Sequence, residues 1–219
     1  AMVWDILKTP PTRTSVIMSP PSYASSGEAE ATEIPLKQWV EGLEPMLGKP
    51  PVQIQSVEVG TMNLAAAWAN MEPSKREALL AGIVKTHALV VVATASASMG
   101  NVSIMVLRDP AKAPVFIETL EEMAQNNLKQ LQGTQSSMQV SDISVSDFPT
   151  ELASPSRRFS FTIGTTGEST KQKQVIYRLS IGSLLVEIFD GNVGIPDKDV
   201  VEITRRIRQA YEKHLGTRK

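Results

Sequence analysis

The chain has 219 residues, of which 42% are hydrophobic and 21% are charged, and its formal net charge is −1. This composition is typical of a soluble globular protein with one large domain or two small ones, and the balanced charge argues against a protein built to bind nucleic acid. Because there is no cysteine and there are only two histidines, the sequence excludes disulfides, thiol nucleophiles, iron–sulfur clusters and three-histidine zinc sites.

Residues 1–33 differ in composition from the rest of the chain. Prolines at positions 10, 11, 20 and 21 interrupt them, and residues 22–33 are small, polar and acidic, which is typical of a linker. The leading Ala-Met resembles a cloning remnant, so we expect that a native leader was removed; the residues present show no basic region followed by an apolar one. We predict a flexible arm over 1–33 and a single domain over 34–219.

The pattern after the arm predicts helices and a strand. Gly48 and Pro50 are stop signals for a first helix, and Ser74 and Glu77 stand at capping-box spacing at the start of a second. The predicted elements are a weak helix over 36–48, a strand over 52–60 and a short helix over 73–87. The Ala-rich residues 62–70 are compatible with either a helix or a strand.

The longest uncharged run raises the question of a membrane span. Residues 88–107 carry no formal charge, and 20 residues is about the length of a membrane-spanning helix. However, residues 94–98 alternate polar and apolar side chains, and Met99-Gly100-Asn101 follows them as a turn signal. Because alternation around a glycine-containing turn is typical of a hairpin, we predict a β-hairpin here and no transmembrane span.

The rest of the chain reads as a helix, a run of strands and a last helix. Pro114 stands where a first helical residue often does, and Gly133 ends that helix. The predicted elements are a helix over 115–132, strands over 138–146, 157–164, 173–182 and 183–190, and a helix over 197–215. Together the elements predict an α+β fold in which an antiparallel β-sheet is covered by helices.

The order of hairpin, proline-containing link and helix occurs twice, over 90–128 and over 175–215. This order supports a further hypothesis, an internal duplication of a strand–strand–helix unit. The related halves would then span about 34–110 and 111–219.

From about residue 88 onward, the element order together with the stretches FSFTI and VIYRLSIGSLLVEI resembles the PsbP-like superfamily. That superfamily includes the photosystem II accessory protein, the LpqN-type actinobacterial lipoproteins and a Ran-binding nuclear import factor. The resemblance implies an α/β/α sandwich and a non-enzymatic role as an adaptor or envelope protein. It carries over no functional residue, because no diagnostic motif accompanies it.

Basic residues gather on two strands that we expect to pair. If Phe159 and Tyr177 face the core, alternation places Arg158 and Arg178 on the opposite side of their strands. An Arg-rich solvated face can dock an acidic partner or a lipid headgroup, although it is more often plain surface. The residues expected to face solvent are Arg158, Ser160, Thr162, Gln174, Arg178 and Ser180. The candidate binding residues are Arg157, Arg158, Lys173 and Arg178.

We expect no catalytic residue, metal or cofactor, because His87 and His214 both suit structural positions on apolar helix faces. The leading hypothesis is a non-enzymatic binding or adaptor protein that docks a protein partner through its sheet face. It would be exported or tethered to a membrane through the removed leader, with residues 1–33 as the spacer. One alternative is a cytosolic chaperone or assembly factor, and another is an enzyme with an unrecognised carboxylate or Ser site.

Overall fold

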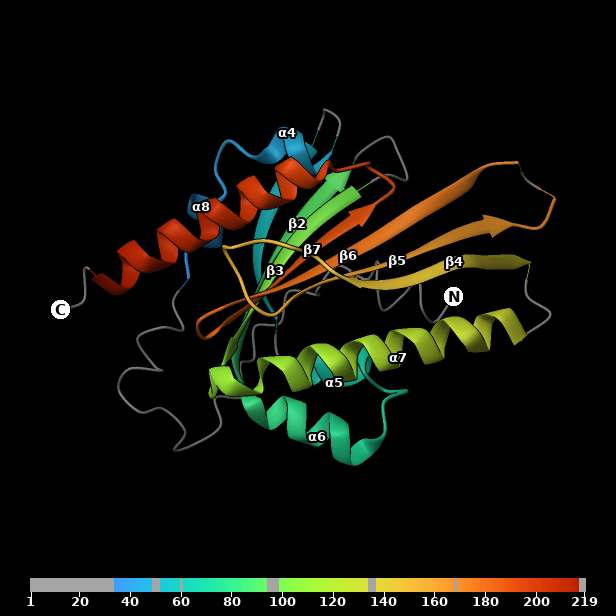
Figure 1. The fold of residues 1–219 in the computed structure, drawn as a ribbon, viewed down its shortest axis with the longest axis horizontal. Helices are drawn as coiled ribbons and strands as arrows, with labels where there is room; N and C mark the ends of the chain where they lie inside the picture. Colours follow the sequence, from blue (N-terminus) through green and yellow to red (C-terminus); the bar gives the residue numbers. More distant parts are fainter. Residues whose placement is uncertain are drawn as a thin grey trace.

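An antiparallel sheet organises the fold. The computed structural model describes residues 34–48, 52–59, 61–93, 99–133, 137–167 and 169–216. Within these ranges seven strands form one sheet in the order β1-β2-β3-β7-β6-β5-β4 (Figure 1). The strands are β1 (Val52–Val59), β2 (Ile83–Ala93), β3 (Met99–Leu107), β4 (Met138–Asp147), β5 (Ser156–Thr165), β6 (Lys171–Ile181) and β7 (Leu184–Gly191). The predicted α+β fold with an antiparallel sheet is confirmed.

Helices lie over both faces of the sheet, as Figure 1 shows, and each face is named here by its longest helix. The α8 face carries α8 (Asp197–Gly216) and the short helices α3 (Leu36–Trp39) and α4 (Glu44–Leu47). The α7 face carries α7 (Ala113–Gly133), α5 (Thr61–Ala67) and α6 (Pro73–Gly82), and a 3₁₀ turn, η1 (Pro110–Lys112), leads into α7.

The two long helices bury apolar stripes at helical spacing. Val200, Ile203 and Ile207 of α8 are fully buried and pack against β3, β6 and β7. On the opposite face, Leu120 and Leu128 of α7 pack in clusters that include side chains of β5, β6 and β7. Because β7 and the part of β6 from Gln174 onward are covered on both sides, almost all of their side chains are buried, whichever face they point to.

A β-bulge shapes the edge strand β4. The register shifts between Ser141 and Ser144, and the extra residue, Asp142, has a φ of 54°. The bulge lets Val140, Ile143 and Val145 all pack in the α7-face cluster although their spacing is uneven. It therefore keeps the serines of β4 together on the other face.

The predicted hairpin is confirmed, because β2 and β3 pair antiparallel. The predicted turn at Met99-Gly100-Asn101 is wrong, since these residues belong to β3 and pair with β7. A Cβ on Gly100 would lie 2.7 Å from the carbonyl oxygen of Leu47, so glycine at this position lets α4 approach the strand closely. Residues 94–98, which connect the two strands, lie outside the described residues.

Two predicted helices differ from the structure. The helix expected over 36–48 is two short helices, separated around Gly42, whose φ of 85° no helix accommodates. The helix expected over 73–87 ends at Gly82, and residues 83–87, His87 included, belong to β2. Its N-cap is Glu72, which accepts hydrogen bonds from the backbone N–H groups of Ser74 and Lys75. A hydrogen bond from the Ser74 hydroxyl, and then these two backbone bonds, lower the pKa of Glu72.

The proposed division into an arm and related halves stays a prediction. Residues 1–33 lie outside the described residues. The two halves share one continuous sheet through the pairing of β3 with β7. The helices that follow these two strands, α7 and α8, lie on opposite faces of the sheet, so the two strand–strand–helix units are not packed alike.

Candidate functional site

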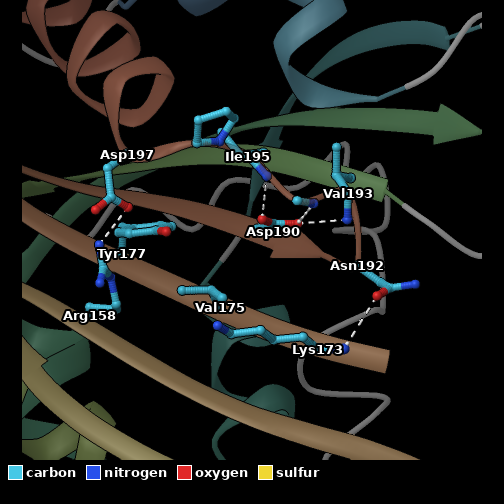
Figure 2. A pocket seen from close by; sticks show the side chains of 11 residues that line it. Arg158, Lys173, Val175, Tyr177, Asp190, Asn192, Val193, Ile195 and Asp197 are labelled. Atoms are coloured by element: carbon cyan, nitrogen blue, oxygen red, sulfur yellow. Dashed lines mark hydrogen bonds and ion pairs between the residues drawn. The ribbon is translucent and has the colours of Figure 1, made fainter. Parts of the chain in front are cut away.

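A pocket opens on the α8 face, between β6 and the segment that leads from β7 to α8 (Figure 2). Its volume is about 330 Å³. The lining residues are Arg158 of β5, Lys173, Val175 and Tyr177 of β6, Asp190 of β7, and Asn192, Val193, Gly194, Ile195, Pro196 and Asp197 after it. Two of the four candidate binding residues, Arg158 and Lys173, therefore line the same pocket.

Asp190 holds the loop that forms one wall of the pocket. Its Oδ1 accepts hydrogen bonds from the backbone N–H groups of Val193 at 2.7 Å and Gly194 at 3.1 Å. Its Oδ2 accepts from the N–H of Ile195 at 2.7 Å, and the side chain is buried. Figure 2 shows this carboxylate at the centre of the loop. The three bonds compensate the buried charge and fix the loop, in which Asn192 and Gly194 have positive φ.

Arg158 connects β5 to the first turn of α8. Its Nη2 lies 2.5 Å from Oδ1 of Asp197. The guanidinium carbon also lies 5.1 Å from the ring centroid of Phe148 and 5.4 Å from that of Tyr177, which is cation–π geometry. The charge of Arg158 is thus shared with groups of the protein itself, and this end of the pocket is close to neutral.

Tyr177 forms part of the pocket floor and is buried. Burial raises the pKa of its hydroxyl, and the positive charge of Arg158 opposes that increase. The neutral phenol is therefore the form present at physiological pH, and it is not poised to act as a general base.

Lys173 lies at the other end of the pocket. Its backbone N–H donates to Oδ1 of Asn192 at 3.3 Å, which ties β6 to the start of the loop. The side chain is exposed, and no carboxylate of the described residues pairs with its ammonium group. Lys173 is therefore the pocket's uncompensated positive charge within the described part of the chain.

The structure separates the four candidate residues by face. Arg158 and Lys173 lie on the α8 face, whereas Arg157 and Arg178 lie under α7, since Arg157 pairs with Glu121 of α7 and is in register with Arg178. The expectation that Gln174, Arg178 and Ser180 face solvent is wrong: they are 0%, 4% and 6% exposed. Strand alternation correctly predicts that Arg178 and Tyr177 point to opposite faces of the sheet, but helices cover both faces at these positions.

The two arginines under α7 are held in ion pairs. Arg178 Nε lies 3.0 Å from Oε2 of Glu187, its neighbour on β7. Hydrogen bonds to Glu121, and then to Asp147, raise the pKa of the Arg157 guanidinium. Both arginines are therefore paired with carboxylates of the fold itself, Arg178 in the interior and Arg157 in a half-buried position.

Beside the pocket, the α8 face continues as a polar surface without a helix over it in the described part of the chain. The register places Ser141 beside Thr162, Thr162 beside Lys173, and Ser144 beside Ser160. All of these side chains are exposed or half-buried. The open sheet face, as this surface is called below, consists of Ser141, Ser144, Ser146, Ser160, Thr162, Lys171 and Lys173. It combines small hydroxyl groups with two lysines, and the carboxylate of Asp142 lies at its β4 edge, where Oδ2 accepts a hydrogen bond from the Ser141 hydroxyl.

Sequence reasoning missed Asp190, Asn192 and Asp197 as residues of the site. The stretch Asp190-Gly191-Asn192 has the composition of a turn, and that is the one signal that could have drawn attention to this loop. Of the two pocket carboxylates, Asp190 accepts hydrogen bonds from backbone N–H groups and Asp197 forms an ion pair with Arg158. Both interactions are expected of ionised structural groups. Within the described ranges no group of three or more His, Asp or Glu side chains is placed to hold a metal ion.

None of the described helices has both the length and the apolar character needed to cross a membrane. No protein-family model and no curated protein sequence matches the chain. Among solved structures, the chain is similar to the extracellular domain of PknH from Mycobacterium tuberculosis, with a TM-score of 0.46 and 10% identity over 87% of this chain and 97% of that one. These values are too low to transfer a role, and the resemblance to the PsbP-like superfamily stays a prediction.

Proposed function

We propose that the protein is a non-enzymatic binding protein that docks an acidic segment of a partner protein on the open sheet face. The observation that carries this proposal is the charge of that face. Lys171 and Lys173 project from it, and neither forms an ion pair with another described residue. Since these two lysines outnumber the one carboxylate at its edge, Asp142, the face attracts negative charge.

The shape of the open sheet face suits an extended segment. On β4 and β5 its side chains are those of serines and a threonine. These side chains are short, so a bound segment can lie close to the strand backbone, and their hydroxyl groups are hydrogen-bond donors and acceptors. The two lysines on β6 border this row along one side. An acidic segment lying on the serine row would reach both ammonium groups.

Export or membrane tethering remains part of the proposal. It is supported by the proline-, serine- and acid-rich composition of residues 1–33, which suits a spacer between an anchor and a folded domain. Fractionation of cells that express the full natural chain would test this part separately from docking.

The docking proposal is tested by mapping where an acidic peptide binds. The ¹⁵N-labelled protein would be titrated with a peptide of alternating Glu and Ser, and with a control in which Lys replaces Glu. The acidic peptide is expected to shift the backbone amide signals of Ser144, Thr162 and Lys173, and the basic peptide to leave them unchanged. Shifts confined to another surface, or none at millimolar peptide, would refute docking at this face.

A further inference from the structure

The pocket has its own set of charged groups, of which only Lys173 also belongs to the open sheet face. Asp190 is compensated by three backbone N–H groups and Asp197 by Arg158. Of the charged groups that line the pocket, Lys173 remains without a described partner. A ligand that carries one negative charge would therefore neutralise the pocket, whereas a cation would meet no free carboxylate.

The rest of the lining is largely apolar. Val175 and Tyr177 form the floor from β6, while Val193, Ile195 and Pro196 form the wall. A volume of about 330 Å³ lies at the lower end of the range for pockets that hold small molecules. It accommodates an apolar group the size of an aromatic side chain rather than a nucleotide.

Charge and shape together define the ligand. We propose that the pocket binds a carboxylate attached to a small apolar body, with the carboxylate at Lys173 and the apolar body against Val175 and Val193. Asn192 only ties the backbone of Lys173 to the loop, through its Oδ1, and the Lys173 side chain runs from there toward Val175 (Figure 2). This proposal does not depend on protein docking, because the pocket and the open sheet face are different sets of residues. Lys173 is the one residue that they share.

The test compares two probes of nearly identical shape, 3-phenylpropanoate and its neutral amide, in ¹⁵N titrations of the full chain. The carboxylate is expected to bind in the millimolar range and to shift the amide signals of Val175, Val193 and Gly194. The neutral amide should bind about threefold more weakly, the factor expected of one exposed charge pair. Equal affinities for the two probes, or no shifts over 192–196, would overturn the proposal.

Single substitutions distinguish ligand binding in this pocket from peptide binding on the open sheet face. Lys173→Gln is expected to reduce the affinity of the carboxylate to that of the amide and to leave the amide unaffected. Val193→Phe fills the pocket and should abolish binding of both probes, and its amide spectrum reports whether the variant is folded. Lys171→Gln should weaken binding of the acidic peptide alone. Loss of probe affinity in Lys171→Gln equal to that in Lys173→Gln would contradict a separate pocket.

The same carboxylate could belong to a free small molecule or to the end of a protein chain. A short peptide that ends in Phe, with either a free or an amidated C-terminus, distinguishes these sources. Tighter binding of the free-ended peptide than of 3-phenylpropanoate, with added shifts at Thr162, would support a chain end. Weaker binding of that peptide would support a free small carboxylate, and identical binding of its free and amidated forms would count against carboxylate recognition altogether.

Discussion

Arg157 of β5 and Glu121 of α7 form a doubly hydrogen-bonded ion pair across the α7 face. Nε lies 3.0 Å from Oε1 and Nη2 lies 3.3 Å from Oε2. The Glu121 side chain is only 11% exposed, so removing its charge leaves the Arg157 guanidinium with the exposed carboxylate of Asp147 as its remaining described partner. Glu121→Gln is expected to lower the free energy of unfolding by about 1–3 kcal/mol, measured by urea denaturation.

The adjacent carboxylate provides a matched control. Glu122 pairs with Lys75 of α6 at 3.1 Å, but both side chains are about half exposed. Glu122→Gln should therefore cost less than about 1 kcal/mol. If the two variants are destabilised equally, the Arg157–Glu121 pair does not fix α7 to the sheet.

Gly100 is required by the close approach of α4 to β3. A Cβ at this position would lie 2.7 Å from a backbone oxygen of Leu47 and 3.3 Å from that of Phe189, and neither can move cheaply. We expect Gly100→Ala to lower the free energy of unfolding by about 1–3 kcal/mol. Gly133→Ala is the control, because no atom lies within 4 Å of its added Cβ. Unchanged stability in Gly100→Ala would show that α4 is not packed as described.

Tyr177 is expected to make the free energy of unfolding fall at alkaline pH. Burial raises the pKa of its hydroxyl above the value of about 10 that it has in the unfolded chain. The folded state therefore holds this proton more tightly, and the stabilisation is complete below about pH 10 and is lost as the pH rises through the folded pKa.

The comparison with Tyr177→Phe isolates this group from the lysines that titrate in the same range. Between about pH 9 and pH 11, wild type should lose stability relative to Tyr177→Phe, as followed by urea unfolding at each pH. A difference between the two proteins that does not change with pH would mean that the phenol is not buried as the structure places it.

Asp190 organises the pocket loop through three backbone hydrogen bonds. In Asp190→Asn one oxygen becomes an NH₂ group, which cannot accept the bonds that Asp190 Oδ1 or Oδ2 accepts. We expect a loss of about 1–3 kcal/mol in the free energy of unfolding and faster amide hydrogen exchange over 192–196. Exchange rates equal to those of wild type would show that another group holds the loop.

The long elements could be predicted from the sequence because each repeats one pattern over its whole length. The stripe formed by Val200, Ile203 and Ile207 defines α8, and the alternation through Phe159 and Phe161 defines β5. The end of α6 was missed, because Ile83 and Val84 continue a helical apolar pattern although Gly82 ends the helix. Their β-branched side chains suit the strand in which they lie.

The candidate site was predictable only in part. Alternation shows which residues share a face, but it does not show which face is covered by helices. Arg178 was therefore expected in solvent, whereas Glu187 on the neighbouring strand compensates its charge beneath α7. The pocket depends on the loop after Asp190 folding back against β6, and hydrogen bonds between residues distant in the sequence, such as Lys173 and Asn192, set that geometry.

Docking at the open sheet face is tested most sharply by the affinity of the Glu–Ser peptide for a charge-reversed protein. Lys171→Glu/Lys173→Glu would be compared by calorimetry with Lys112→Glu/Lys129→Glu, in which two exposed lysines away from the open sheet face are reversed. We expect that the first variant no longer binds the peptide, whereas the second binds it within about threefold of wild type, with an affinity that falls with salt as that of wild type does. Equal losses in both variants would contradict docking at the open sheet face and indicate attraction to overall charge alone.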